Sequence, residues 1–125
     1  MNSAEQIVIK KPQGIEVRQV ATSDDQELRK LVSLPMTTRG LTLSFQREPS
    51  YFKASQVIYT QIDSTVAQDH STGCLVGCYN IGLRPCYVNG TVMPFRYGGD
   101  LRLSPQVRGK AVLKQMTPHF KTSLK

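Results

Sequence analysis

The fold is decided by the stretch GDLRLSPQVRGKAVL, which spans residues 99 to 113. Its pattern predicts a strand, a short basic loop with one glycine, and the start of a helix. The first N–H groups of a helix have no partner within it and carry partial positive charge, so such a loop can bind phosphate. Gly109 lets the main chain come close to a ligand, and Arg108 and Lys110 add full positive charges. The stretch therefore predicts a phosphate cradle, and an ordinary strand-to-helix turn with solvated basic residues is the alternative.

The same stretch resembles the acetyl-CoA-binding motif of the GNAT superfamily of N-acetyltransferases. In that family the fourth strand leads into Pro-x-x-Arg-Gly-x-Gly-x-Gly and then into a helix. Pro105, Arg108 and Gly109 match this motif, whereas Ala111 and Leu113 stand where its last two glycines would be. The resemblance therefore implies a cofactor cradle that is more crowded than usual.

The resemblance also implies a site and a reaction. Main-chain groups at the end of the strand would hold the pantetheine arm and thioester, and the loop would hold the pyrophosphate. The implied cofactor-binding residues are Leu101, Leu103, Arg108, Gly109, Lys110 and Ala111. An acceptor amine of unknown identity would attack the acetyl thioester while a general base removes its proton. Asp100 is the candidate base, although strand alternation puts it on the Arg102 face, which favours a salt bridge between the two.

Upstream of this stretch, the sequence predicts one strand and one helix. Alternation of apolar and polar residues predicts the strand over Ile15 to Val20. Ser23 is the expected N-cap of the helix, and Pro35 is expected to end it. The predicted apolar stripe of this helix consists of Leu28, Leu31 and Val32.

Further strands are predicted from runs rich in Val, Ile, Tyr and Cys: Val57 to Ile62, Cys74 to Val88, and Phe95 to Leu103. A flexible loop is expected over Thr65 to Gly73.

Several turn signals refine these strands. Asn89-Gly90 predicts a type I′ hairpin turn. Arg84-Pro85 indicates a bulge or an edge, and Gly98-Gly99 indicates a bulge or a close approach by another group. Pro118 is expected to end the last helix.

The segment from Arg47 to Phe52 has two interpretations. It resembles an acceptor-side segment of some GNAT enzymes, and it also fits a polar turn with a buried aromatic pair, which we favour.

Together these elements predict an α+β fold with a mainly antiparallel, GNAT-like sheet flanked by helices. Residues 1–14 form an N-terminal extension, and residues 15–125 form an incomplete GNAT-like domain. The resemblance covers residues 15 to 116, because a complete domain continues through a further strand, helix and closing strands that often supply a general-acid tyrosine. Activity of the chain alone is therefore uncertain, and a homodimer or a partner chain could complete the cleft.

Charge and composition add limits. The 125 residues carry a formal net charge of +7, and the chain has no acidic residue after Asp100. The alternative function is a non-catalytic basic module that binds nucleic acid or a protein, but the sequence offers no aromatic stacking platform for nucleic acid. The sequence predicts neither a signal peptide nor a membrane span, which indicates a cytoplasmic protein.

The three cysteines are expected to be buried free thiols rather than zinc ligands. On a regular strand Cys74 and Cys78 would lie about 13 Å apart, too far to share one zinc ion.

Overall fold

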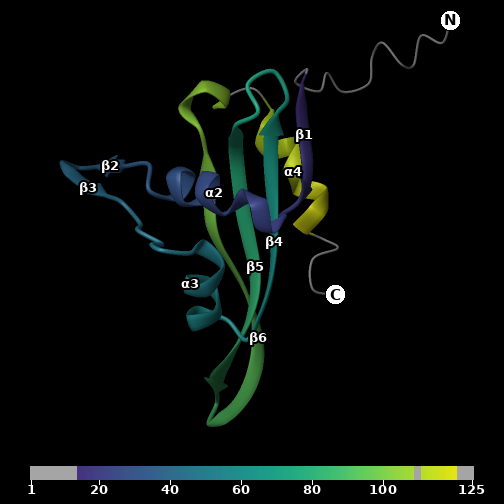
Figure 1. Cartoon of the computed structure of the whole chain (residues 1–125). Coiled ribbons are helices and arrows are strands. Elements are labelled where there is room, and N and C mark those ends of the chain that lie inside the picture. The colour runs from purple at the N-terminus through teal and green to yellow at the C-terminus, as the bar shows by residue number, and fades with distance from the viewer. Residues whose placement is uncertain (1–13, 109–110, 121–125) are drawn as a thin grey trace, which may run out of the picture.

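The structure is a computed structural model and describes residues 14–108 and 111–120, which form an α+β fold (Figure 1). A four-stranded antiparallel sheet has the order β1-β4-β5-β6, and β2 and β3 form a separate small hairpin. The predicted fold class, α+β with a mainly antiparallel sheet and flanking helices, is confirmed. The elements are β1 (Ile15–Gln19), η1 (Thr22–Asp24), α2 (Asp25–Val32), β2 (Met36–Thr38), β3 (Leu41–Leu43), α3 (Tyr51–Ile58), β4 (Gln61–Asp69), β5 (Leu75–Val88), β6 (Thr91–Leu103), η2 (Pro105–Val107) and α4 (Val112–Phe120).

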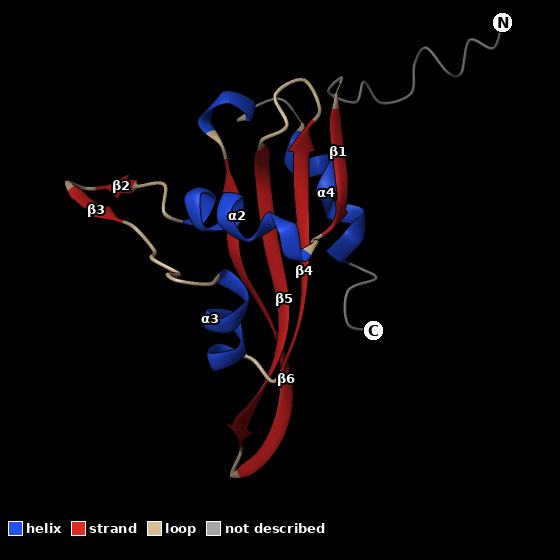
Figure 2. Ribbon diagram, viewed as in Figure 1, coloured by secondary structure: helices blue, strands red, loops and turns tan. Residues whose placement is uncertain are grey.

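Helices lie on both faces of the sheet (Figure 2). The sheet separates two hydrophobic clusters. Helices α2 and α3 cover one face, where the buried residues are Leu28, Leu31, Val32, Tyr51, Val66, Leu75 and Cys78. Helix α4 covers the other face, where they are Ala67, Val76, Tyr79, Ile81, Val107, Val112 and Met116. Strand β5 contributes to both clusters, and the register shift in its pairing with β4 at Ala67 and Gln68 interrupts the regular alternation of its residues between them.

Helix α2 buries the predicted stripe of Leu28, Leu31 and Val32, but it does not begin at the predicted cap. Ser23 lies inside the preceding short helix η1. The Ala21 N–H donates to the Asp24 carboxylate at 2.7 Å. Asp24 also forms a two-pronged ion pair with Arg18, which lowers the pKa of its carboxyl. The N-cap prediction was wrong: Asp24 occupies the N-cap position of α2, and its carboxylate pairs with Arg18 on β1 instead of accepting an N–H of the helix.

The predicted strand over Val57 to Ile62 was wrong in its first half. Helix α3 runs through Ile58, and the strand β4 begins at Gln61. The Ser50 hydroxyl accepts the Lys53 N–H at the start of the helix, and burial of Tyr51 and Ser55 holds it against the sheet. Val57 is 88% exposed, so its β-branched side chain makes little packing contact that would favour a strand over the helix.

The favoured interpretation of the preceding segment, a polar turn with a buried aromatic pair, holds in part, because Tyr51 is buried but Phe52 is only partly buried. The rings of Tyr51 and Phe52 meet edge to face at 5.9 Å, and Tyr51 is fully buried.

Strand β4 is longer than predicted. The expected loop over Thr65 to Gly73 contains five residues of β4, up to Asp69, and Thr65 is buried in the middle of the sheet. The polar composition of these residues predicted a loop, but they belong to a central strand whose backbone groups form hydrogen bonds with β1 and β5.

The Asn89-Gly90 turn is confirmed: both residues have positive φ, 51° and 81°, and Tyr87 pairs with Val92. Beyond Leu83 strand β5 no longer pairs with β4, so Pro85 lies at an edge as predicted. The turn thus closes a two-stranded arm that extends past the rest of the sheet (Figure 1).

The glycines of β5 and β6 make room for Tyr59. A Cβ on Gly82 would lie 2.3 Å from the Tyr59 ring, and one on Gly99 would lie 2.9 Å from its hydroxyl oxygen. The close approach predicted at Gly98-Gly99 is thus a tyrosine ring resting on the sheet.

We expect Gly82→Ala to lower the free energy of unfolding by about 1–3 kcal/mol, because the new methyl group displaces the Tyr59 ring. Urea denaturation measures this change. Gly98→Ala is the matched control, since its Cβ would only touch Ile81 at 3.7 Å and should change stability by less than about 0.5 kcal/mol. Equal stability of the two variants would contradict the packing role of Gly82.

Helix α4 continues past the predicted stop and includes Pro118. The proline stands near the C-terminal end of the helix, so its missing N–H removes a bond only from the last turn. Val112 and Met116 are buried, whereas Leu113 is exposed.

Candidate functional site

Strand β6 offers an open edge next to the turn that the sequence singled out. Within the described part of the chain, β6 pairs with β5 on one side and has no strand on the other. The Ser104 N–H donates to Val76 O at 2.8 Å, so the main-chain groups of Leu103, and of Leu101 before it, point away from β5. The main chain of the two leucines can therefore reach a ligand along this edge.

A bulge interrupts β6 just before this edge. The pairing register changes by one residue between Cys78 opposite Arg102 and Asn80 opposite Gly99. The extra residue is accommodated at Asp100, whose φ of 52° lies in the left-handed region. The bulge that the glycine pair indicated is therefore present, one residue further along the chain.

Three donors hold the Asp100 carboxylate in place. Tyr51 donates its hydroxyl at 2.9 Å, Asn80 its amide at 3.0 Å, and Arg47 forms an ion pair at 3.2 Å. We call these four residues the Asp100 network. Asp100 is only 14% exposed, so its oxygens are committed to protein donors.

The other groups of this network are also constrained. Asn80 donates to Tyr51 Oη at 2.6 Å, and the Ser64 hydroxyl donates to Asn80 Oδ1 at 2.7 Å. Burial, followed by the charge of Asp100, raises the pKa of Tyr51, so its hydroxyl stays protonated and acts as a donor. The network thus fixes the bulge to α3 and β5.

The predicted salt bridge between Asp100 and Arg102 was wrong. The ion-pair partner of Asp100 is Arg47, which comes from the segment between β3 and α3. Arg102 instead lies over the Phe45 ring, 4.9 Å from its centre, and donates to Leu101 O at 2.8 Å. Sequence reasoning missed Phe45 and the role of Arg47, because contacts between residues more than 50 positions apart leave no local signal.

The turn after β6 contains the predicted basic loop. Helix η2 follows Ser104, Arg108 is exposed, and α4 starts at Val112. Ala111 has a φ of 63°, a conformation that glycine adopts without strain. Gly109 and Lys110 lie outside the described residues.

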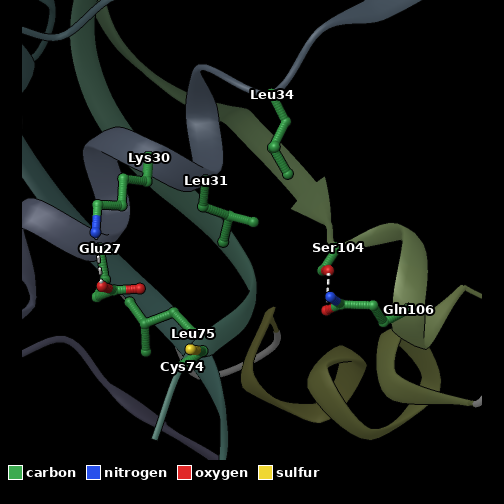
Figure 3. A pocket seen from close by; sticks show the side chains of 8 residues that line it. All are labelled: Glu27, Lys30, Leu31, Leu34, Cys74, Leu75, Ser104 and Gln106. Atoms are coloured by element: carbon green, nitrogen blue, oxygen red, sulfur yellow. Dashed lines mark hydrogen bonds and ion pairs between the residues drawn. The ribbon is translucent and has the colours of Figure 1, made fainter. Parts of the chain in front are cut away.

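A pocket of about 350 Å³ opens beside this turn, on the side of α2 (Figure 3). Figure 3 shows Ser104 and Gln106, joined by a hydrogen bond of 2.8 Å, across the pocket from the side chains of α2. The residues that line it are Glu27, Lys30, Leu31, Leu34, Cys74, Leu75, Ser104 and Gln106.

All three cysteines are free thiols, as predicted, but only Cys78 is buried, and Cys86 is partly buried. Cys78 is buried, which raises its pKa to about 12, and its thiol donates to Asp100 O at 3.2 Å. Cys74 is exposed, because it precedes β5 and lies in the turn rather than in the strand. Among residues 14–108 and 111–120, no three His, Cys, Asp or Glu side chains group as metal ligands.

None of the helices in the described part of the chain is long and apolar enough to cross a membrane.

Comparisons with known proteins identify the fold. No protein-family model matches the chain, and no curated protein matches it. A crystal structure of an acetyltransferase from Trypanosoma brucei is similar over 86% of this chain and 75% of that chain, with 19% identity and a TM-score of 0.51. The chain shares the fold of that acetyltransferase.

Proposed function

We propose that this chain binds acetyl-CoA and forms the cofactor-binding part of a GNAT-type N-acetyltransferase. One observation carries the proposal: the open edge of β6 at Leu101 and Leu103 leads through η2 directly into an exposed arginine, Arg108, and the start of α4. An open edge and a basic helix start suit the two ends of a coenzyme that is peptide-like in one half and phosphorylated in the other.

In this proposal the pantetheine arm runs along β6 as an added strand would. The outward main-chain groups of Leu101 and Leu103 bind its amides. Arg108, Gly109, Lys110 and Ala111 hold the pyrophosphate, with the N–H groups of the α4 start completing the cradle.

The proposed reaction is transfer of the acetyl group to an amine. The amine nitrogen attacks the thioester carbonyl, the carbon–sulfur bond breaks, and coenzyme A leaves as the thiol after it gains a proton. We do not assign Asp100 as the base that takes the amine proton, because its largely buried carboxylate already accepts from Tyr51, Asn80 and Arg47. We therefore assign Asp100 a positioning role: it fixes the bulge and with it the edge at Leu101.

The first test is calorimetric titration of acetyl-CoA into the whole chain, with adenosine diphosphate as the control for simple phosphate attraction. Saturable binding of acetyl-CoA that exceeds binding of the control supports the proposal. A folded chain that ignores acetyl-CoA contradicts it. Salt-dependent binding of RNA by that chain would instead favour a basic nucleic-acid module.

We expect Arg108→Glu to weaken acetyl-CoA binding at least ~10-fold, because it places a negative charge where the pyrophosphate would lie. Lys53→Glu is the matched control: it makes the same change of charge at an exposed position in the first turn of α3. Calorimetry of both variants gives the comparison. Unchanged affinity in Arg108→Glu, or equal losses in both variants, would remove the loop from the site.

A further inference from the structure

Arg102 occupies a distinctive position at the open edge of β6. Its guanidinium lies over the exposed Phe45 ring at 4.9 Å and donates to Leu101 O at 2.8 Å. The Leu101 carbonyl belongs to the open edge, whereas Phe45 belongs to the segment that joins β3 to α3, which Figure 1 shows at the β6 side of the molecule. Arg102 therefore sits where the edge meets the α3 face of the sheet.

No carboxylate neutralises Arg102 among the residues that the structure describes. Asp100, two positions away, forms its ion pair with Arg47, whose guanidinium lies 5.5 Å from the centre of the same Phe45 ring. Phe45 thus contacts two arginines, of which one is paired and one is not. An unpaired arginine held by a ring and a carbonyl is ready to bind an anion, because little side-chain freedom is left to lose.

Its remaining donors suit a carboxylate or a phosphate group. The Nε atom of Arg102 is buried, and one Nη1 hydrogen is used by Leu101 O, which leaves the outer Nη hydrogens for a ligand. Guanidinium groups bind carboxylates and phosphates through such pairs of hydrogens.

We propose that Arg102, held by Phe45, binds the anionic group of the acceptor, and that the acceptor is a primary amine bearing a carboxylate or a phosphate. The proposal rests on the proposed acetyl transfer. The phosphates of acetyl-CoA are assigned to Arg108 and the start of α4, on the far side of Leu103 from Arg102. An anion at Arg102 therefore lies near the thioester end of the cofactor, where the attacking amine must also lie.

The test uses two matched pairs of amines: phosphoethanolamine with ethanolamine, and β-alanine with β-alaninamide. Each is titrated by calorimetry into the whole chain saturated with coenzyme A. We expect the anionic member of each pair to bind at least ~10-fold more tightly. We expect Arg102→Gln to abolish this preference and to leave acetyl-CoA affinity within about twofold.

Arg84→Gln is the matched control, because Arg84 also stacks on an aromatic ring, Tyr97 at 5.8 Å, but lies in the hairpin arm. It should keep the preference. Equal binding of both members of each pair, with acetyl-CoA still bound, would overturn the acceptor assignment alone. A large loss of acetyl-CoA affinity in Arg102→Gln would overturn it by placing Arg102 in the cofactor site. Absence of acetyl-CoA binding to the unchanged chain would overturn the proposed function.

Discussion

Asp100→Ala is expected to lower the free energy of unfolding by about 3–5 kcal/mol, because it leaves a charge and two donors without their acceptor. Arg47, only 17% exposed, would lose its ion pair, and the buried Tyr51 and Asn80 would lose a hydrogen bond each. Alanine would also adopt the left-handed conformation at φ 52° less readily than aspartate does. Loss of the bulge should weaken acetyl-CoA binding as well, because the bulge sets the edge at Leu101.

Urea denaturation of four variants separates these contributions. Asp63→Ala is the control, since that carboxylate accepts only the exposed Gln19 amide among the contacts described for it, and should cost less than about 1 kcal/mol. Asp100→Gly removes the strain but not the loss of the acceptor, so it should stay well below the unchanged protein. Asp100→Ala combined with Arg47→Met should recover part of the loss. A cost below about 1 kcal/mol for Asp100→Ala would show that the network does not hold the bulge.

Met116→Ala is expected to cost about 2–5 kcal/mol, because it opens a cavity between α4 and the sheet. Met116 is fully buried, and its sulfur would lie 3.1 Å from a Cβ on Gly77, so the helix is seated closely on β5. The start of the same helix belongs to the proposed phosphate cradle. Affinity for acetyl-CoA should therefore fall together with stability.

Leu113→Ala provides the comparison on the same helix. Leu113 is 40% exposed, and its truncation should cost less than about 1 kcal/mol. Thermal or urea unfolding measures the loss of stability in Met116→Ala and in Leu113→Ala. Equal costs would mean that α4 is not anchored through Met116.

Local patterns were enough to predict the hairpin, the long strand of residues 75–88, the first helix and the order of elements around the basic turn. In each case the signal lies within a few residues, such as two residues that accept positive φ at Asn89-Gly90. The α+β class followed from that order.

Predictions failed where distant contacts override local preference. The β-branched residues of 57–62 favoured a strand, but residues up to Ile58 belong to helix α3. Burial of Tyr51 against the sheet stabilises this helix and outweighs the local preference. Asp24 forms an ion pair with Arg18, and Asp100 forms one with Arg47. Neither arginine is adjacent to its partner in the sequence, so local patterns do not predict these pairs. Polar Thr65 is central because two neighbouring strands satisfy its backbone, which composition cannot reveal.

Pro94 has a consequence for how copies of this chain meet. It lies on β6 opposite Pro85, at a position whose main chain faces the open edge, so it offers no N–H there. If a second copy paired its own β6 with this edge, the row of backbone hydrogen bonds between the two strands would be interrupted at Pro94. The proline therefore divides the thirteen-residue edge into stretches of three and nine residues, and we expect it to hinder strand-by-strand association between copies.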